Sequence, residues 1–390
     1  MHMDPVLPTM VGTLFVMLLV GGLLKFMHQP QIIAYLLAGV VIGPHGFGLI
    51  SDSELVHRLG ALGVVLLLFF VGMEVVPEKL KARWRIPVIG TVLQVLFCFA
   101  PVALIGMAYD WSWARIALLT FVVSLSSSAV VIRLLQDRNE LSTGFGQDML
   151  GVLLVQDLLV IPMLIVIGLF GGQQIDMHSL SMQMLGVLLM GGLLVWIFSG
   201  RQLKLPLGNH IRGDHEIQVF TALAICFGLA LLTGVLELST ALGAFIGGML
   251  VSAARETQWV HHKLEPFKVV FVALFFLAIG MSLNLNFVAD HWWQVGLLVI
   301  AVFIVGTLVN AVILAALGYK WRESLYGGTV LAQIGEFSFV LAAVGLQAAI
   351  ISDAGYQLAL SVISMSLLLG PLWITLGRSC FKPVIDNANA

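Results

Sequence analysis

Asp157 is the residue of this sequence whose type and position most directly indicate chemistry. It follows Gln156 in a segment of Leu, Val and Ile, about eight residues or roughly 12 Å into an expected helix over residues 149–170. A charge that deep in an apolar helix is costly and usually functional. An apolar environment disfavours the charged form of a carboxylate, so this group can hold a proton or, once deprotonated, a dehydrated cation. Competition between the two would give cation/proton exchange; an aspartate that only hydrogen-bonds a neighbouring helix is the structural alternative.

A run of serines interrupts another apolar segment, expected as a helix over residues 115–135. The run includes Ser126, Ser127 and Ser128. Serine hydroxyls bond back to helix carbonyls, and such a cluster predicts an unwound stretch whose freed backbone groups face a cavity. Together with Gln156, these groups are expected to complete the oxygen shell of a cation bound at Asp157. The alternative is that these small residues let two helices pack closely.

Four further polar residues lie within apolar segments. Glu336, the second deep carboxylate, follows Gln333 in an expected helix over residues 325–349. It either belongs to the ion path or neutralises the positive end of a half-helix. Gln94 and Asn310 are predicted to support the site, and hydrogen bonding that only holds helices together is the alternative for both.

The composition places these residues in a membrane protein. Hydrophobic residues make up 59% of the 390 and charged residues only 10%, whereas soluble globular domains carry about 25% charged residues. The net charge is −2 and the basic residues are scattered, so nucleic acid is not an expected partner. The three cysteines have no metal-binding or redox spacing. We therefore expect a chain surrounded by lipid, without a cofactor or metal of its own and without enzyme activity.

Apolar segments long enough to span a bilayer, about 20 residues each, run through the whole chain. They predict an all-α membrane protein of about thirteen transmembrane helices. The helices form a single transport domain over residues 1–390, with no soluble regulatory domain in this chain. The expected helices cover residues 6–26, 32–50, 59–76, 86–107, 115–135, 149–170, 180–199, 217–236, 239–254, 267–283, 292–317, 325–349 and 356–376.

The distribution of Lys and Arg predicts the orientation of these helices. With the N-terminus outside, every Lys and Arg except Arg58 and Arg115 falls in an inside connection, as the positive-inside rule requires. The C-terminus is then cytoplasmic, and the expected location is a bacterial inner membrane. Glu74 and Asp148 lie near cytoplasmic helix ends, where they would draw cations into an inner funnel.

Two pairs of similar motifs predict an inverted repeat. Residues 68–73 resemble residues 274–281, and residues 38–43 resemble residues 243–248. Both pairs are seven helices apart, and an odd offset turns the second copy over in the membrane. Secondary transporters are often built in this way, with the binding site near the midplane where the copies meet. The predicted halves cover residues 32–170 and 239–376.

The two polar interruptions fit the same repeat. The helix that carries Ser126–Ser128 and the helix that carries Glu336 are also seven apart. Interrupted helices at corresponding positions of the two halves are the best pointer from sequence to a transporter's binding site. We therefore predict that both helices are broken near these residues and that Asp157 lies beside the breaks.

With these motifs, the sequence resembles the monovalent cation:proton antiporter-2 family, and within it the Kef-type potassium/proton exchangers. The matching stretches follow the family order along nearly the whole chain, so they are specific for the family and less specific for the ion. They are Tyr35 to Gly39, Gly43-Pro44, Phe69 to Glu74, Ser126 to Ala129, Gln156-Asp157, Gly243 to Phe245, Phe275 to Met281, and Gln333 to Phe337.

The resemblance implies a homodimer in which a mobile core domain, with two crossed broken helices, moves against a dimerisation domain. It implies that Asp157 alternately carries a proton and potassium, or sodium. Electrogenic relatives have Asp-Asp or Asn-Asp in place of Gln156-Asp157 and a lysine near Asn310. One deep carboxylate without that lysine predicts electroneutral exchange. Kef-type proteins usually continue into a cytoplasmic nucleotide-binding domain, so a regulatory domain or subunit outside this chain is a further expected partner.

Three other functions stay open. A sodium/proton antiporter of the same fold would use the same carboxylate, and a channel-like potassium efflux system would conduct through the same broken helices. An intramembrane aspartyl protease is the remote enzymatic alternative. That chemistry needs two aspartates close enough to share a proton, and Asp157 is the one aspartate deep in an expected span.

Overall fold

The computed structural model describes residues 12, 15, 19, 31–48, 53–74, 85–141, 143–170, 177–199, 215–236, 238–253 and 260–381. These residues form helices and no strand, which confirms the expected all-α fold. The expected helix over residues 6–26 lies outside the described ranges, apart from residues 12, 15 and 19. The elements are α2 (Gln31–Ile42), α3 (Ser53–Glu74), the π-helical turn η1 (Arg85–Ile89), α5 (Gly90–Ala108), α6 (Trp113–Ser124), α7 (Ser128–Asp137), α8 (Gly144–Phe170), α9 (Met177–Phe198), α11 (His215–Val235), α12 (Thr240–Ala253), α13 (Val260–Ser282), α14 (Leu285–Asp290), α15 (Trp292–Ala316), α16 (Trp321–Leu331), α17 (Phe337–Gln347) and α18 (Asp353–Phe381).

Each expected helix from residue 32 onward overlaps one of these helices or two in succession, but the helix expected over residues 32–50 ends at Ile42 and is followed by turns. The helix expected over residues 115–135 is divided into α6 and α7, and the one over residues 325–349 into α16 and α17. The short helix α14 was not predicted. Its start is capped by the Asn284 side chain, which accepts the N–H of Phe287 at 3.1 Å, and six residues are too few to show a helical period.

Five helices of the described part of the chain are long and apolar enough to cross a membrane unaided. Shorter apolar helices, among them α6 and α17, accompany them. These lengths fit the integral membrane protein that the composition predicts. The five are residues Arg85–Ala108, Gly144–Phe170, Glu216–Val235, Trp292–Ala316 and Asp353–Phe381.

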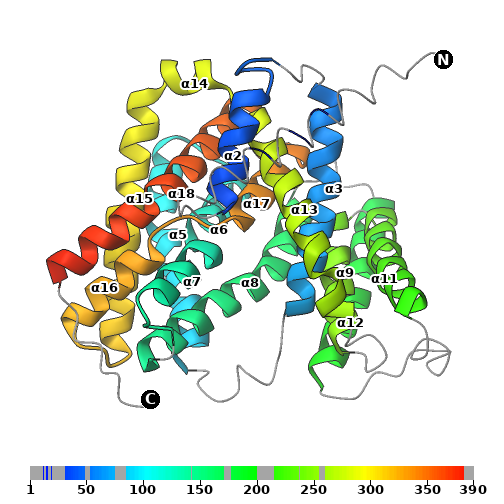
Figure 1. Ribbon diagram of the computed structural model, residues 1–390, viewed down its shortest axis with the longest axis horizontal. Coiled ribbons are helices and arrows are strands. Elements are labelled where there is room, and N and C mark those ends of the chain that lie inside the picture. The colour runs from blue at the N-terminus through cyan, green and yellow to red at the C-terminus, as the bar shows by residue number, and fades with distance from the viewer. Residues whose placement is uncertain are drawn as a thin grey trace.

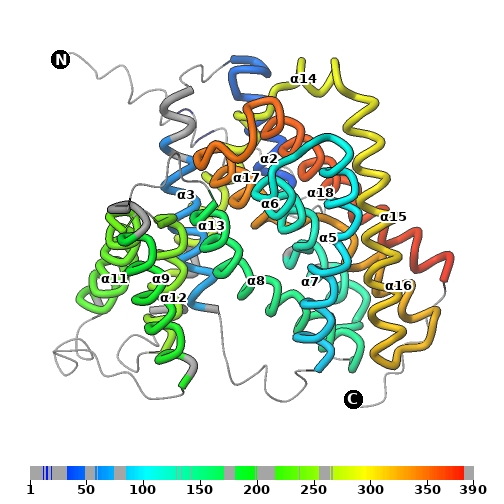
Figure 2. The backbone as a smooth tube through the Cα atoms, turned by 180° about the vertical axis from the view of Figure 1, so that it is seen from behind, coloured from blue at the N-terminus to red at the C-terminus, as the bar shows by residue number. Residues whose placement is uncertain are grey.

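The helices form two bundles (Figures 1 and 2). The scaffold bundle consists of α2, α3, α11, α12 and α13, which pack extensively on one another, and α9 lies against α12. The crossing bundle consists of η1, α5, α6, α7, α15, α16, α17 and α18. Helix α8 packs in the crossing bundle against η1, α6, α7 and α17, and it also reaches α12 of the scaffold bundle.

Glycines hold the scaffold bundle together at two equivalent contacts. Gly39 of α2 lies against Gly280 of α13, and Gly72 of α3 lies against Gly248 of α12. A Cβ at any of the four would overlap a backbone carbonyl oxygen of the facing helix. All four lie in or next to the motifs that predicted the inverted repeat, so those motifs provide the close backbone approach that small residues permit in membranes.

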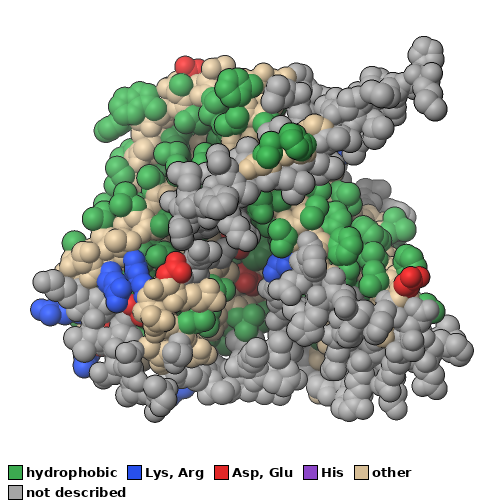
Figure 3. All heavy atoms as spheres, in the orientation of Figure 1, with side chains coloured by type: hydrophobic (Ala, Val, Ile, Leu, Met, Phe, Trp, Pro, Cys, Tyr) green, Lys and Arg blue, Asp and Glu red, His purple; other side chains and the backbone are tan. Residues whose placement is uncertain are grey.

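Three connections predicted to be cytoplasmic gather at one end of the crossing bundle. Phe145 near the start of α8 packs against Tyr319 and Tyr326, with ring centroids 5.9 and 5.4 Å away. Arg378 in the last turn of α18 forms an ion pair with Glu140 at 2.9 Å. On the face drawn in Figure 3, most visible Lys and Arg side chains lie in the lower half, and hydrophobic side chains dominate the upper half. This clustering is what the predicted orientation requires; the orientation itself stays a prediction.

Gly280→Ala is expected to destabilise the protein, because the added methyl group would overlap the carbonyl oxygen of Leu36. Overpacking of this kind costs roughly 1–3 kcal/mol, so the thermal unfolding temperature of the purified protein in detergent should fall. Gly228→Ala on α11 is the matched control. No atom lies within 4 Å of its added Cβ, and alanine favours helix. Equal losses in the two variants would contradict the role given to the glycine contacts.

Candidate ion-binding site

The site lies where two broken helices pass each other inside the crossing bundle. Residues 125–127 separate α6 from α7, and residues 332–336 separate α16 from α17. The two stretches run antiparallel, with an isolated bridge between Ser126 and Ile334. The breaks predicted from the polar interruptions are therefore confirmed, and they cross each other directly.

Serine hydroxyls satisfy backbone carbonyls that the breaks leave without helical partners. The Ser126 hydroxyl donates to the carbonyl oxygen of Leu331 at 2.7 Å, and the Ser338 hydroxyl donates to that of Val122 at 2.7 Å. Both bonds connect one broken helix to the other. An unpaired backbone group inside a bilayer costs several kcal/mol, so these hydroxyls make the irregular backbone tolerable at this depth.

Two adjacent serines at the start of α7 bring the two deep carboxylates together. The Ser127 hydroxyl donates to Glu336 Oε2 at 3.0 Å. The Ser128 hydroxyl lies 3.2 Å from Asp157 Oδ2 and 3.4 Å from Oδ1. Asp157 comes from α8 and Glu336 from the start of α17, so three elements meet here. The N-terminus of α7 carries partial positive charge, which favours negative groups at this place.

The two carboxylates differ in access. Glu336 is 8% exposed and its partner Ser127 is fully buried, whereas Asp157 and Ser128 are both partly exposed. Asp157 also lies midway along α8, about 20 Å from Gly144 by the helical rise. Of the two, Asp157 therefore has the more exposed side chain, and Glu336 links the two broken helices through Ser127.

Gln156 uses its amide to fix the break in α6 and α7. Its Oε1 accepts the N–H of Ser126 at 2.9 Å. Its Nε2 donates to Gln94 Oε1 at 2.8 Å and lies 3.2 Å from the Ser126 hydroxyl and 3.4 Å from the carbonyl oxygen of Ser124. The side chain has no exposed surface. Both Gln156 and Gln94 thus belong to the site as positioning residues; a part for Gln156 in the cation's oxygen shell stays a prediction.

Gln333 and Asn310 lie near the crossing without contacting Asp157 in any described hydrogen bond. Gln333 is 1% exposed and packs against Gly370 of α18, and neither of its amide atoms has a hydrogen-bond partner in the described ranges. The Asn310 amide donates to the carbonyl oxygen of Gly306, one turn back in its own helix, at 2.9 Å. Their predicted parts in the site remain predictions.

The residues predicted for an inner funnel fall outside the crossing. Asp148 is 2% exposed, and the Tyr319 hydroxyl donates to its Oδ2 at 2.6 Å. Burial of this kind differs from the solvated position expected near a helix end, because Tyr319 folds over the start of α8. The side chain of Glu74 lies outside the described residues.

A polar network at the end of the crossing bundle was missed from the sequence. Glu140 accepts the Tyr326 hydroxyl at 2.8 Å and pairs with Arg378, and it is only 4% exposed. Arg138 donates to the Tyr326 oxygen at 2.9 Å and to the Thr375 hydroxyl at 3.0 Å. The network ties the turn between α7 and α8 to α16 and α18. The one signal in the sequence is Tyr326, near the start of an apolar helix. A tyrosine there does not identify partners such as Arg138 and Glu140, which are distant in the sequence.

In an all-helical membrane protein, crossed broken helices beside a partly exposed carboxylate are the features expected of a secondary transporter. The family model described as "Sodium/hydrogen exchanger, transmembrane" matches residues 12–376, and the chain belongs to this family. Its members are transporters, so the enzymatic alternative is set aside.

Two relatives with assigned names are similar over most of the chain. The "Iron transporter MagA" of Paramagnetospirillum magneticum is 35% identical over 356 residues, which cover 91% of this chain and 82% of that protein. The "K(+) efflux antiporter 5" of Arabidopsis thaliana is 34% identical over 363 residues, 90% of this chain. The matched part makes up 63% of the Arabidopsis protein.

Solved structures share the fold. The sodium proton antiporter MjNhaP1 from Methanocaldococcus jannaschii at pH 8 has a TM-score of 0.69 at 16% identity, over 95% of this chain and 97% of that one. A second structure, from an electron-microscopy map of the same antiporter, has a TM-score of 0.61. The expected sodium/proton-antiporter-like fold is therefore confirmed, whereas the number of thirteen helices and the repeat halves over residues 32–170 and 239–376 stay predictions.

Two buried glutamines at the crossing give a matched test of the site's construction. Gln156→Leu should destabilise the fold strongly, because it leaves the Ser126 N–H and the Gln94 amide without partners, and each orphaned buried group costs roughly 1–3 kcal/mol. Gln333→Leu removes an amide that already has no described partner and should be neutral or stabilising. Thermal unfolding in detergent measures both. A large loss for Gln333→Leu would show that its amide is bonded in the native protein.

Proposed function

We propose that this chain exchanges potassium for protons across the membrane by alternating access, with Asp157 as the shared binding group. One observation carries the proposal: a partly exposed carboxylate lies at the middle of α8, facing the hydroxyl of Ser128 at the start of a half-helix. A group in this position is reachable by ions and yet surrounded by protein that disfavours a lasting charge.

The exchange reaction follows from the competition for one carboxylate. Deprotonated Asp157 binds the cation, and the Ser128 hydroxyl rotates to offer it an oxygen lone pair. Protonation of Asp157 removes the negative charge and releases the cation. The crossing bundle, which carries Asp157 and both broken helices, then moves against the scaffold bundle so that the same group faces the other side of the membrane.

The arrangement supports electroneutral exchange. Asp157 is the reachable carboxylate, while Glu336 is buried and bonded to Ser127. Asn310 is neutral and is bonded within α15. A site that alternates between one bound proton and one bound monovalent cation carries the same charge in both loaded states. The expected stoichiometry is therefore one for one.

We favour potassium over sodium because of the names of the more similar relatives, and over iron because of the donor atoms around Asp157. The Arabidopsis relative is named a potassium efflux antiporter, whereas MjNhaP1, a sodium proton antiporter, shares the fold at 16% identity. The relative at 35% identity is named an iron transporter, and this makes ferrous iron the second candidate. One carboxylate and hydroxyl oxygens form a hard donor set. Such a set suits alkali cations better than iron, which favours sites that include imidazole or several carboxylates.

The assembly and location belong to the same proposal. The chain is a homodimer in a bacterial inner membrane, with its N-terminus outside and its C-terminus in the cytoplasm. The support is the family membership and the clustering of charged connections at one end of the crossing bundle. A cytoplasmic regulatory domain or subunit is the expected further partner.

Asp157→Asn is expected to abolish exchange, because an amide can neither release a proton nor neutralise a cation. The measurement is proton movement in liposomes with an internal pH dye and a clamped voltage, after addition of potassium, sodium, lithium or ferrous iron. Asp290→Asn, on the exposed end of α14, is the matched control and should retain wild-type rates. Size-exclusion profiles check that both variants fold.

The ion that drives proton movement identifies the transported cation, and the Asp157→Asn variant tests whether Asp157 is the binding group. Potassium-driven proton movement that is lost in Asp157→Asn supports the proposal. Proton movement driven by iron, without a response to potassium, would show that ferrous iron is the transported cation. Wild-type rates in Asp157→Asn would show that another group carries the proton.

Competition for Asp157 also predicts a pH dependence. In the pH range where protons displace potassium from Asp157, the apparent KM for potassium should rise as the pH falls, by at most about tenfold per pH unit for one competing proton. The maximal rate should change much less. If exchange is one for one, the potassium and proton gradients at which net flux stops should be the same at every clamped voltage. An apparent KM that is constant across that pH range would separate the proton site from the cation site.

A further inference from the structure

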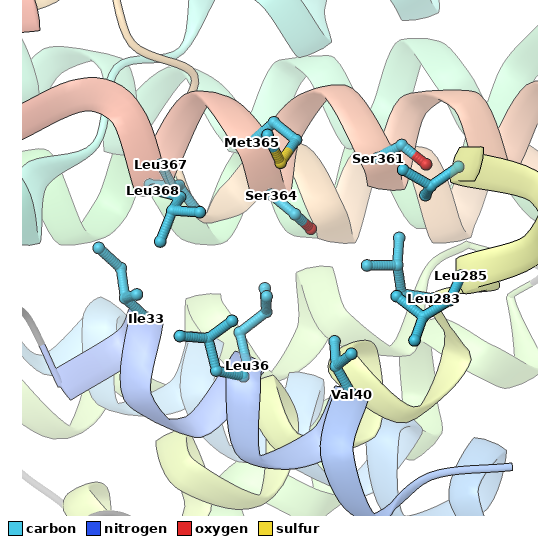
Figure 4. Close-up of a pocket in the computed structure, with 12 residues that line it drawn as sticks. Ile33, Leu36, Val40, Leu283, Leu285, Ser361, Ser364, Met365, Leu367 and Leu368 are labelled. Atoms are coloured by element: carbon cyan, nitrogen blue, oxygen red, sulfur yellow. The ribbon is translucent and has the colours of Figure 1, made fainter. Parts of the chain in front are cut away.

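An apolar cavity lies between the two bundles, and Asp157 is not among the residues that line it. It encloses about 160 Å³ between α2 on one side, α18 on the other, and the turn from α13 to α14 at one end. Figure 4 shows the facing walls, with Leu36 and Val40 on α2 and Leu283 and Leu368 on neighbouring elements. Nearly all of its wall is hydrocarbon. We call it the interbundle cavity.

Two serines of α18, Ser361 and Ser364, line this wall, and Ser364 is the exceptional one. Its side chain is 6% exposed, and its hydroxyl oxygen is buried without a hydrogen-bond partner among the described residues. Figure 4 shows that the hydroxyl points from α18 across the gap toward α2. Nearby serines of the same helix are satisfied, since Ser361 donates to the carbonyl oxygen of Gln357 at 2.6 Å and Ser366 to that of Ile363 at 3.0 Å. Serines in helices usually bond back in this way, so Ser364 has a hydroxyl available to a guest.

The size and chemistry of the cavity favour one kind of guest. Water needs two to four polar partners to be held, and dry apolar cavities of about 150 Å³ accept a benzene-sized molecule. One unpaired hydroxyl in an apolar wall therefore matches a small neutral molecule with an apolar body and a single hydroxyl or carbonyl group. We propose that the interbundle cavity is a binding site for such an amphiphile, of the alcohol or phenol class, which enters from the surrounding bilayer.

The depth of Ser364 argues against a phospholipid chain as the occupant. Ser364 lies eleven residues, or about 16 Å, beyond the start of α18 at Asp353. The hydrocarbon core of a bilayer is about 30 Å thick, so this hydroxyl is far from the layer where lipid ester groups reside. An acyl chain could fill the space but could not offer the hydroxyl a partner, whereas a small alcohol carries its polar group to that depth.

A guest in the interbundle cavity would lie between the two bundles and would affect their relative movement. The opposite face of α18 touches the broken helix, because the Ser366 oxygen accepts the N–H of Ile334 at 3.3 Å. A guest between α2 and α18 would thus join the scaffold bundle to the bundle that contains Asp157. If the proposed exchange is correct, occupancy slows it; binding itself does not depend on that function.

Photolabelling with a six-carbon alcohol that carries a diazirine tests the site directly. The purified wild-type protein in liposomes is labelled, and adducts are located by mass spectrometry with the hexane-based diazirine as a hydroxyl-free control. We expect saturable adducts on the cavity-lining parts of α2 and α18, reduced at least tenfold by Val40→Phe, which fills the cavity. Leu368→Phe fills it from the other wall and replaces Val40→Phe if that variant does not fold.

Ser364→Ala tests whether the guest is bound through the Ser364 hydroxyl or only fills the apolar space. Loss of one hydrogen bond should lower alcohol labelling about three- to tenfold and leave hydrocarbon labelling unchanged. Equal effects on the two probes would overturn the assignment in favour of a purely apolar occupant such as an acyl chain. Adducts spread over bilayer-facing residues such as Leu104 and Leu188, 71% and 69% exposed, and insensitive to both filling variants, would show that the alcohol only partitions into lipid.

Discussion

The structure depends on one constraint, which is that a broken helix inside a membrane must find partners for its backbone. Here the two breaks supply partners to each other. The N–H of Gly335 donates to the carbonyl oxygen of Leu125 at 2.8 Å, and a Cβ at Gly335 would crowd the Ser126 carbonyl. Gln156 accepts the N–H of Ser126, and the Ser126 hydroxyl donates to the carbonyl oxygen of Leu331. Irregular backbone is tolerated at this depth only when protein covers it in this way.

This constraint also determines where the charges lie. A break creates two half-helices, and each half-helix exposes an end with partial charge in the middle of the membrane. The start of α7 receives both Asp157 and Glu336 through adjacent serines. The crossing covers one carboxylate and leaves the other partly exposed. In the proposed mechanism, the partly exposed Asp157 binds proton and cation in turn, and Glu336 stays with the crossed helices.

Much of this arrangement could be predicted from local sequence, and the rest could not for a physical reason. Hydrophobic segments gave the helices, and the polar interruptions around Ser126 and Glu336 gave the breaks, because both are properties of short stretches. The partners of Gln156 and the burial of Gln333 depend on contacts between residues far apart in the chain. The network of Glu140 and Arg378 does so as well. Asp148 was expected near solvent, and only the packing of Tyr319 over α8 explains its burial.

The comparisons separate what the fold fixes from what a few side chains decide. MjNhaP1 keeps the architecture at 16% identity, as expected if backbone pairing and close helix contacts constrain the chain more than individual side chains do. Relatives at 34–35% identity nevertheless have names that refer to different cations. Hydroxyl and carboxylate oxygens bind many hard cations. In the proposed mechanism, selectivity therefore comes from how closely the side chains of Ser128 and its neighbours surround Asp157, and these can change without disturbing the paired breaks.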